Sequence, residues 1–404
     1  MTVLFVHDHF FVQSPKNIYS DKFSYPILAR YLGVFDEVRV WGRVRKVLNE
    51  PENMMVSSGP NIDFSFGEDI SSLRSFGGMR KRACRYLKNM IMESDAVIVR
   101  LPSEYGMMAA ALARKYNKPW AVEVVGCAWD ALWNYGGFNA KCYAPVAYLR
   151  MKSVVNKAPF ALYVTSRFLQ ERYPPAKYAI TTNISNVELD EIDRAPVDKR
   201  LKRLAHLRKS FVFGTIGSLK SRSKGIETAV EALSRLSRIK PDIQFEYRVL
   251  GEGDRSPYLQ LARKNGVADR LRFDGYLPGG APVLEWLDGI DIYLHPSFSE
   301  GLPRALIEAM SRGCPAVGSD AGGIPELISG NLIHRAGNAQ QLVDILEKLT
   351  ADSRILEEEA VRNFETSISY SKSILDKKRT EFLNRFSKYA TKMKSETISQ
   401  HTDS

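Results

Sequence analysis

Cysteine is scarce in this sequence, and the few that occur do not have the spacing of a metal or redox site. The 404 residues contain four, at Cys84, Cys127, Cys142 and Cys314. Structural zinc sites and redox motifs place cysteines within a few residues of one another, so neither is expected. A sequence this poor in cysteine is also not a disulfide-stabilised secreted protein, and we expect a reducing, cytoplasmic location.

Long apolar runs and a basic leader are missing as well. No apolar stretch approaches the ~18 residues that cross a bilayer. The first residues, MTVLFVHDHFF, lack the basic start of a secretory signal and soon become polar. With 44% apolar and 25% charged residues, the composition predicts a globular protein, and the length predicts more than one domain.

Basic residues outnumber acidic residues, and this excess of positive charge limits the classes of partner that we expect. Lysine and arginine total 57 against 46 aspartates and glutamates, which gives a formal net charge of +11. Such an excess favours anionic partners such as nucleotides or a lipid surface. No zinc-finger or RNA-binding aromatic motif accompanies the charge, so nucleic acid is not an expected partner.

Short apolar runs alternate with helical stretches along the chain. Continuous apolar runs of this length predict parallel strands buried on both faces. In the first half, strands are expected at residues 2–7, 37–43, 95–102, 118–126 and 160–166. After a charged segment at 188–210, further strands are expected at 211–217, 246–253, 270–277, 290–297 and 314–320. The pattern predicts an α/β protein with two doubly wound domains.

We place these domains at residues 1–190 and 195–369. A basic helix at 370–395 follows, and we expect it to pack back on the first domain. In open parallel sheets, ligands bind beyond the carboxyl ends of the strands. Two such domains that face each other across a cleft would therefore hold the site between them.

The segment SEGLPRALIEAM, residues 299–310, carries two glutamates eight positions apart. It follows an expected strand, and Pro303 suits the first turn of a helix because it has no N–H to leave unpaired. Free N–H groups and the helix dipole make such a turn a site for an anion, and Gly301 allows close approach. With a diphosphate at the helix start, Glu308 would lie near a ribose and Glu300 near a second sugar.

A simpler interpretation is that Glu308 pairs with Arg304, one turn earlier on a solvated helix face. The neighbouring segments favour the ligand site. Upstream, GTIGSLKSRSKGIETAVEAL predicts a strand, a polar loop and a helix, with Lys224 at the helix start, where it could hold a phosphate. Downstream, GCPAVGSDAGGIPELI predicts another strand, a glycine turn and a helix.

In their order along the chain, these segments resemble those of the retaining nucleotide-sugar glycosyltransferases of glycosyltransferase family 4, also called group 1. The matching stretches are GSLKSRSKG, VLGEGD, LRFDGYL, PSFSEGLPRALIEAM and GCPAVGSDAGGIPELI, within residues 211–328. The resemblance implies the GT-B fold, in which two Rossmann-like domains face each other across a cleft. It implies transfer of a hexose from a nucleoside-diphosphate sugar to a glycan or lipid-linked acceptor, in cell-surface polysaccharide or glycolipid synthesis. Retention of anomeric configuration, no cofactor and no metal are implied too.

The resemblance also implies roles for particular residues. Glu300 would contact the donor sugar at its reacting end and Lys224 would neutralise the diphosphate, so these two are the expected catalytic residues. The expected contacts to the donor sugar and diphosphate are Gly217, Ser218, Lys224, Glu300, Gly301, Leu302 and Pro303. The expected contacts to the nucleoside are Gly251, Gly275, Tyr276 and Glu308, with Glu308 at the ribose.

Two departures from the family pattern stand out. Many members have an arginine where this sequence has Ser218, and Lys220 and Arg222 are the candidates to replace it. Many members also have a histidine at the end of the fourth strand, where this chain has Val125 and Gly126.

Residues expected at strand ends of the first domain are candidates for the acceptor side. His7 and His9 would end the first strand, and His9 would contact the acceptor or transfer a proton, with a packed histidine as the alternative. Arg100 would bind an acceptor phosphate or form a plain ion pair. Trp129 and Asp130 would form a platform for a sugar, with a half-buried loop tryptophan as the alternative.

Residues 77–92 predict an amphipathic helix with a basic face. Its apolar stripe would comprise Met79, Ala83, Tyr86, Leu87, Met90 and Ile91, which should pack on the sheet. The basic residues Arg80, Lys81, Arg82, Arg85 and Lys88 would be either solvated or docked on an anionic membrane. The protein could then lie at the inner face of the plasma membrane.

Two other functions are compatible with the same fold and the same nucleotide-sugar site. A sugar-nucleotide epimerase of the same fold would form an epimer and transfer nothing. A non-catalytic nucleotide-sugar-binding protein is the other rival, and the set Glu300, Glu308 and Lys224 argues against it. A nicotinamide-dependent oxidoreductase is disfavoured, because VLGEGD lacks the third glycine of a dinucleotide fingerprint.

Overall fold

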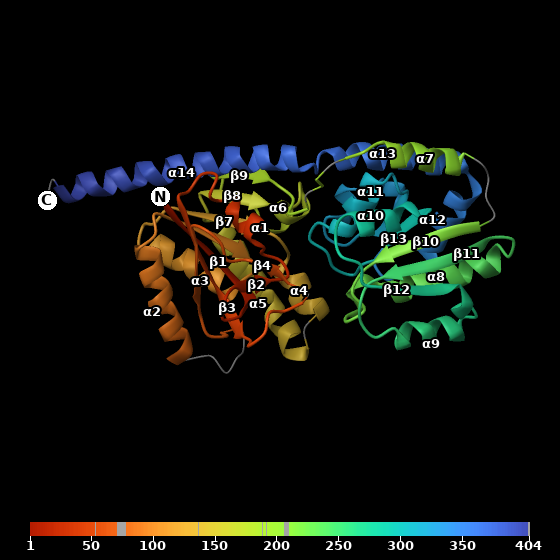
Figure 1. Cartoon of the computed structure of the whole chain (residues 1–404), viewed down its shortest axis with the longest axis horizontal. Coiled ribbons are helices and arrows are strands. Elements are labelled where there is room, and N and C mark those ends of the chain that lie inside the picture. The colour runs from red at the N-terminus through yellow and green to blue at the C-terminus, as the bar shows by residue number, and fades with distance from the viewer. Residues whose placement is uncertain are drawn as a thin grey trace.

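The computed structural model describes the chain except residues 53, 71–77, 136, 188, 191, 206–209 and 403–404. Two largely parallel sheets lie side by side with helices packed against them, and a long C-terminal helix runs back across the first of them (Figure 1). The predicted α/β fold class with two doubly wound sheets is confirmed.

The first sheet has nine strands in the described part of the chain. The parallel strands run in the order β5-β3-β1-β6-β7-β8-β9, and β2 and β4 form an antiparallel extension at the far end of β1. Their bounds are β1 (Thr2–Gln13), β2 (Ile18–Ser20), β3 (Glu37–Lys46), β4 (Met55–Val56), β5 (Ile62–Phe66), β6 (Ala96–Leu101), β7 (Trp120–Val124), β8 (Phe160–Tyr163) and β9 (Ile180–Asn183).

Alternate residues of β1 face two separate cores. Leu4 and Val6 pack with residues of α2, α3 and α5, whereas Val3 and Phe5 pack with α1 and the C-terminal helix. Both faces of the strand are therefore covered, which explains its continuous apolar run. The helices of this half are α1 (Tyr25–Ala29), α2 (Gly78–Met92), α3 (Glu104–Lys115), α4 (Ala128–Tyr135), α5 (Phe138–Val155) and α6 (Phe168–Arg172).

The first strand departs from its prediction. The sequence predicts an end near residue 7, whereas β1 continues to Gln13 and pairs with β3 beyond a register shift between Val6 and Phe10. His7 and His9 therefore lie inside the strand, at this irregularity. Sequence analysis also misses the short strands β2, β4, β5, β9 and β15, because two to five residues show too little periodicity.

The second sheet is wholly parallel, with the order β12-β11-β10-β13-β14-β15. The chain winds outward in one direction from β10 and then in the other from β13, so the strand order reverses between these two neighbours. The strands are β10 (Ser210–Ile216), β11 (Gln244–Leu250), β12 (Leu271–Gly275), β13 (Ile292–His295), β14 (Ala316–Ser319) and β15 (Ile333–His334). In doubly wound sheets, this reversal marks the ligand crevice.

Helices cover both faces of the second sheet. Residues of α8, α9 and α12 pack on one face, and residues of α10 and α11 pack on the other. The helices are α7 (Ala195–Leu204), α8 (Ile226–Ile239), α9 (Ser256–Lys264), α10 (Ala281–Asp288), α11 (Arg304–Ser311), α12 (Ala339–Ala351) and α13 (Ser353–Ile368). Short 3₁₀ turns are η2 (Arg222–Lys224), η3 (Ala268–Arg270), η4 (Ile324–Glu326) and η5 (Gly330–Leu332).

The C-terminal helix α14 (Lys372–Thr402) lies against the first sheet. Its Phe386 is fully buried, with its ring centroid 5.2 Å from that of Phe160 in β8. The two chain crossings between the halves run together, because the N–H of Lys372 donates to the carbonyl of Leu189 at 2.9 Å. Within the described residues, no helix is both long and apolar enough to cross a membrane.

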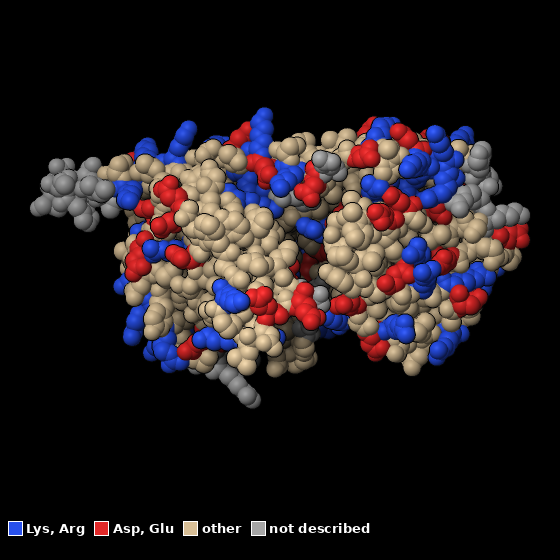
Figure 2. Space-filling model, viewed as in Figure 1, with Lys and Arg blue, Asp and Glu red and all other residues tan. Residues whose placement is uncertain are grey.

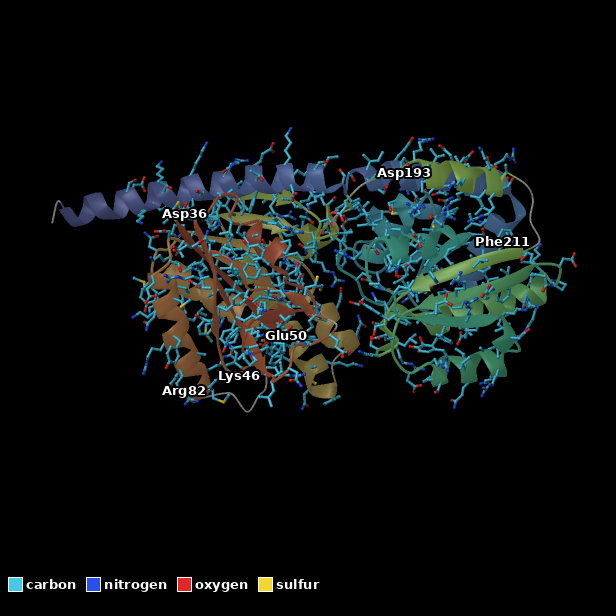
Figure 3. All side chains as sticks on the ribbon, viewed as in Figure 1. Asp36, Lys46, Glu50, Arg82, Asp193 and Phe211 are labelled. Atoms are coloured by element: carbon cyan, nitrogen blue, oxygen red, sulfur yellow. The ribbon has the colours of Figure 1, made fainter. Side chains whose placement is uncertain are left out.

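Helix α2 has the predicted apolar stripe with one exception. Ala83, Leu87 and Ile91 are buried against the sheet, but Tyr86 is 64% exposed. Tyr86 precedes the buried Leu87, and a neighbouring position on a helix is rotated by about 100°. Figure 3 labels Arg82 on this helix, on the side of the first domain that is far from the second.

Candidate functional site

Glu300 lies where the second sheet reverses its strand order. It follows β13, and Lys224 lies at the end of the loop that follows the neighbouring strand β10. The Lys224 Nζ donates to Glu300 Oε1 at 2.6 Å. Two residues far apart in the sequence, both expected in the site, therefore form one ion pair at the expected crevice.

Two further residues hold the same carboxylate oxygen. Ser297 Oγ donates to Glu300 Oε1 at 2.9 Å, and His295 Nε2 lies 3.0 Å from it. A carboxylate oxygen only accepts, so Nε2 carries the imidazole proton. The His295 Nδ1 then accepts from the hydroxyl of Tyr293, 3.4 Å away. The buried imidazole is thus oriented from both sides, and Oε2 of Glu300 receives no hydrogen bond from the described residues.

The electrostatics of this cluster keep Glu300 ionised. Burial works to raise its pKa, but the hydrogen bond from His295 and the ammonium of Lys224 outweigh burial and lower the pKa to about 2. Burial lowers the pKa of His295, against the opposing effect of Glu300, so the imidazole is neutral at neutral pH. The site therefore combines a fixed carboxylate, a neutral imidazole and a cation.

Glycines bring the loops of the site into close contact. Gly225 has a φ of 64°, and a Cβ on it would lie 1.9 Å from the carbonyl oxygen of Pro296. A Cβ on Gly322 would lie 2.0 Å from the carbonyl oxygen of Glu300. Gly217 lies beneath the side chain of Lys224, whose Cγ would be 2.6 Å from an added Cβ. A side chain at Gly225 would separate the loops that carry Lys224 and Glu300, and a side chain at Gly322 would push Glu300 away from the loop after β14. A side chain at Gly217 would displace that of Lys224.

Glu308 lies one turn into α11 and has no hydrogen-bond donor among the described residues. Its side chain is only 15% exposed, and Arg304 Nη1 is 3.8 Å from its Oε1. That distance is longer than a hydrogen bond. Burial raises the pKa of Glu308, and Arg304 opposes this effect only in part. The simpler interpretation, an ion pair with Arg304, is thus present in weak form, and the carboxylate keeps capacity for a ligand hydroxyl.

The predicted nucleoside contacts lie at the carboxyl ends of the adjacent strands. The N–H of Gly251 donates to the carbonyl of Gly275 at 2.7 Å, and a Cβ on Gly251 would lie 2.0 Å from the carbonyl oxygen of Gly217. Tyr276 follows Gly275 and is 57% exposed, so its ring is available to a ligand. These residues extend the site from Glu300 toward β12.

The two candidates to replace the missing arginine differ in their contacts. Arg222 Nε binds Glu227 Oε1 at 2.6 Å, and its side chain is 82% exposed. Lys220 is exposed and has no ion pair among the described residues. Ser218 is also exposed, and its hydroxyl accepts from the N–H of Lys220. Lys220 is therefore the better candidate.

The site is closed from the other side by the first domain. A Cβ on Gly301 would lie 2.7 Å from the carbonyl oxygen of Val125, which follows β7. Glu326, from the glycine turn after β14, accepts hydrogen bonds from the N–H groups of Ser166, Arg167 and Phe168 at the start of α6. These contacts join the two domains beside Glu300 (Figure 2 shows the hollow between the lobes).

A cavity of about 510 Å³ lies between the carboxyl ends of the first sheet and the start of α11. His7 and Arg100 line it from β1 and β6, and Arg304 lines it from the second domain. Arg100 Nη1 donates to Glu123 Oε2 at 2.8 Å. Arg100 thus has the predicted ion pair and also faces the cavity.

The other acceptor-side candidates are engaged in packing. His9 lies between the hydroxyl of Ser20, 2.7 Å away, and the ring of Phe23, and does not line the cavity. Burial lowers the pKa of His9 to about 4, against the charge of Asp21. Trp129 stacks on Trp133, and Asp130 accepts from Arg172 at 3.1 Å. All three side chains thus have partners within the first domain, and Trp129 and Asp130 lie on α4 rather than on the loop expected for Trp129.

Sequence analysis missed two residues that shape the site. His295 ends β13 and holds Glu300, and the only signal for it is its place just before the loop that carries Glu300. Glu326 lies within the quoted segment GCPAVGSDAGGIPELI, but its partners are backbone N–H groups about 160 residues away, which no local pattern reveals. Among the described residues, no three His, Cys, Asp or Glu side chains are grouped so that they could hold a metal ion.

Comparison with known proteins gives a consistent result. A family model described as "Glycosyl transferases group 1" matches residues 210–352. Protein CapJ of Staphylococcus aureus is 30% identical over 389 residues, which cover 96% of each chain. The amylovoran biosynthesis glycosyltransferase AmsK of Erwinia amylovora is 37% identical over 137 residues, 31% of this chain and 33% of that protein. The structure of Anabaena Alr3699/HepE in complex with UDP-glucose superimposes with a TM-score of 0.62 at 16% identity, covering 95% of this chain and 100% of that one.

We predict that the charge of Glu300 stabilises the fold above pH 4.5 and not at pH 2. The pKa falls from 4.5 in the unfolded chain to about 2 in the folded one, so the contribution is lost as the pH falls between these values. Unfolding by urea should show Glu300→Gln less stable than the wild type by about 3 kcal/mol at pH 6. The difference should shrink toward pH 2. A difference that is constant with pH would contradict the assignment.

Proposed function

Because this chain belongs to the family of group 1 glycosyltransferases, we propose that it transfers a hexose from a nucleoside-diphosphate sugar, with retention and without a metal ion. The observation that carries the proposal is the cluster of Glu300, Lys224 and His295 at the reversal of strand order. A neighbour of the fold, HepE, was crystallised in complex with UDP-glucose, which supports a nucleotide sugar as the donor.

The donor would lie across the carboxyl ends of β10 and β13. The diphosphate would lie at the start of α11, where N–H groups and the ammonium of Lys224 offset its charge. Gly217, Ser218 and the backbone of Gly301 to Pro303 would border it. Glu300 Oε2, which has no donor among the described residues, would accept from hydroxyls of the donor hexose. The exposed ring of Tyr276, with Gly251 and Gly275, would border the base.

The proposed chemistry is a substitution on one face of the donor sugar. The bond between the anomeric carbon and the diphosphate oxygen breaks, and the acceptor oxygen bonds to that carbon on the same face. The acceptor's proton passes to the departing diphosphate oxygen. The protein orients the groups and stabilises the charges: Lys224 offsets the negative charge of the leaving group, and the ionised Glu300 lies near the positive charge on the sugar.

The names of related proteins indicate the process in which this chain would act and the donor that it would use. AmsK is named for amylovoran biosynthesis, and other relatives, such as WcaL of Escherichia coli, for colanic acid biosynthesis. These names support polysaccharide or glycolipid synthesis as the process in which this chain acts. The HepE protein was crystallised in complex with UDP-glucose, which puts UDP-sugars first among the donors to be tried.

We predict that Glu300→Gln reduces turnover about a hundredfold or more, because a positioned charge at the reacting centre is lost. The assay would follow release of nucleoside diphosphate from UDP-, GDP-, ADP- and CDP-sugars in the presence of a chelator. The control is Glu285→Gln, an exposed carboxylate on α10 in the same domain, which should keep wild-type turnover. Equal turnover in Glu300→Gln and wild type would refute the role, and formation of an epimer alone would favour the epimerase.

We predict that Glu308 binds the ribose. For the wild type, a 2′,3′-dideoxy nucleoside diphosphate should bind about tenfold or more weakly than the normal one, because the hydroxyls bind a carboxylate. In Glu308→Gln the two ligands should bind with more similar affinity. Calorimetric titration of both ligands into both proteins gives the coupling free energy between Glu308 and the ribose hydroxyls. If Glu308→Gln discriminates as strongly as the wild type, Glu308 does not contact the ribose.

We also propose that the face formed by α2 and α5 contacts an anionic membrane. Helix α3 packs against both, so α2 and α5 cover the same side of the first sheet. Helix α5 exposes apolar side chains, with Phe138 81%, Leu149 62% and Val146 48% exposed. On the other side of α3, α2 carries the exposed cations Lys81, Arg85 and Lys88. Exposed apolar side chains and cations on one side of a domain are the features that bind a lipid surface.

We predict that removing three of these cations weakens membrane binding about a hundredfold, since each contributes about 1 kcal/mol near an anionic surface. The test is co-sedimentation of Lys81→Gln/Arg85→Gln/Lys88→Gln with phosphatidylglycerol-containing vesicles. The control, Lys372→Gln/Lys377→Gln/Lys388→Gln, removes the same charge from α14, which lies across the opposite side of the first domain (Figure 1). If both triple variants bind the vesicles equally, net charge alone explains the binding, and the proposed contact surface on α2 and α5 is wrong.

A further inference from the structure

The cavity between the two domains has a strong excess of positive charge. Among its described lining residues, two are acidic, Asp21 and Glu123, and five are cationic: Lys22, Arg30, Arg100, Arg304 and Arg379. These cations come from the first sheet and its loops, from the start of α11 and from α14. Three separate parts of the chain thus direct positive charge into one space.

The cavity adjoins the donor site. Val125 lines it, and the carbonyl of Val125 is the atom that an added Cβ on Gly301 would approach to 2.7 Å. Arg304 lines it from the first residue of α11, four positions after Glu300. A molecule in the cavity would therefore lie next to the reacting end of a bound donor. At about 510 Å³, the space suits a ligand of one or two sugar units.

Arg100 is held so that it can bind a further anion. Its Nη1 donates to Glu123 Oε2 at 2.8 Å, and the hydroxyl of Tyr31 donates to the other oxygen of Glu123 at 2.6 Å. The guanidinium has five N–H groups, so this bond leaves donors for another partner. A fixed guanidinium is the preferred protein group for phosphate or carboxylate, which it binds through two parallel hydrogen bonds.

The cations on opposite sides of the cavity are weakly neutralised. Lys22 is exposed and has no ion pair among the described residues. The closest carboxylate oxygen to Arg304 is that of Glu308 at 3.8 Å, longer than a hydrogen bond. Repulsion among these cations would be relieved by an anion between them.

We propose that this cavity is the acceptor site and that the acceptor carries a negative group, a phosphate or a carboxylate, next to the sugar that receives the hexose. Lys22, Arg100 and Arg304 bind that group, and the receiving hydroxyl faces Glu300. This inference rests on the proposed transferase function and adds the chemical class of the acceptor. A neutral oligosaccharide would leave Lys22 without an ion pair among the described residues, and Arg304 with only the carboxylate of Glu308 at 3.8 Å.

The test uses the full-length protein with its donor site filled by the nucleoside diphosphate that binds most tightly, so that probes cannot bind there. Glucose 1-phosphate, glucuronate and glucose are titrated by calorimetry. We expect at least one of the two anionic probes to bind about tenfold or more tightly than glucose. Binding of glucose 1-phosphate alone would assign a phosphate, and binding of glucuronate alone a carboxylate. Equal affinity for glucose, or no binding of either anionic probe, would overturn the proposal.

Matched variants locate the binding. Lys22→Gln and Arg304→Gln should each lower the affinity for the anionic probe about tenfold. Lys16→Gln, an exposed lysine between β1 and β2, and Arg272→Gln, a similarly exposed arginine of the second domain, should not. Loss of affinity in all four variants, or in none, would place the probe elsewhere. Release of nucleoside diphosphate from the donor by the wild type tests the transferase function separately, so the two proposals can fail independently.

Discussion

A single, largely buried carboxylate, that of Glu300, organises the loops at the strand-order reversal of the second sheet. One oxygen of Glu300 accepts hydrogen bonds from Lys224, His295 and Ser297. The carboxylate therefore joins the loop after β10 to the loop after β13. The cost of burying this charge is offset only because those donors are present. The close contacts at Gly225 and Gly322 follow from the same requirement, because any side chain there would move the carboxylate away from its partners.

The two domains meet around this cluster. Gly301 contacts the backbone after β7, and Glu326 caps α6 in the first domain, so residues close to Glu300 in the chain and in space also fix the interface. The same interface carries the cation-lined cavity, to which Arg304 contributes from the start of α11. One short stretch of chain, from His295 to Arg304, therefore borders the ion-pair cluster, the expected diphosphate position and the cavity.

Local sequence indicates the Glu300 cluster of the second domain more directly than the cavity lining of the first domain, and this difference has a physical cause. In the second domain, sites depend on short segments in which a strand end, a loop and a helix start follow one another, so local sequence is enough to place Glu300, Lys224 and Gly301. In the first domain, the cavity takes one or two residues from each of several elements. His7 lines the cavity, whereas His9, two residues further along β1, is engaged by Ser20 and Phe23. Such contacts come from other parts of the chain, so the sequence near His9 does not reveal them.

The sequence alone determined the α/β architecture, because continuous apolar runs need two covered faces, and it identified Glu300, Glu308 and Lys224 as candidates through their local setting. Tertiary structure decided what no local pattern encodes. It placed His295 and Lys224 on one oxygen of Glu300, engaged Trp129 and Asp130 in packing, and exposed Tyr86. It also gathered Lys22, Arg100 and Arg304 around one cavity. Such groupings join residues tens to hundreds of positions apart, and only the packing of the two sheets and α14 brings them together.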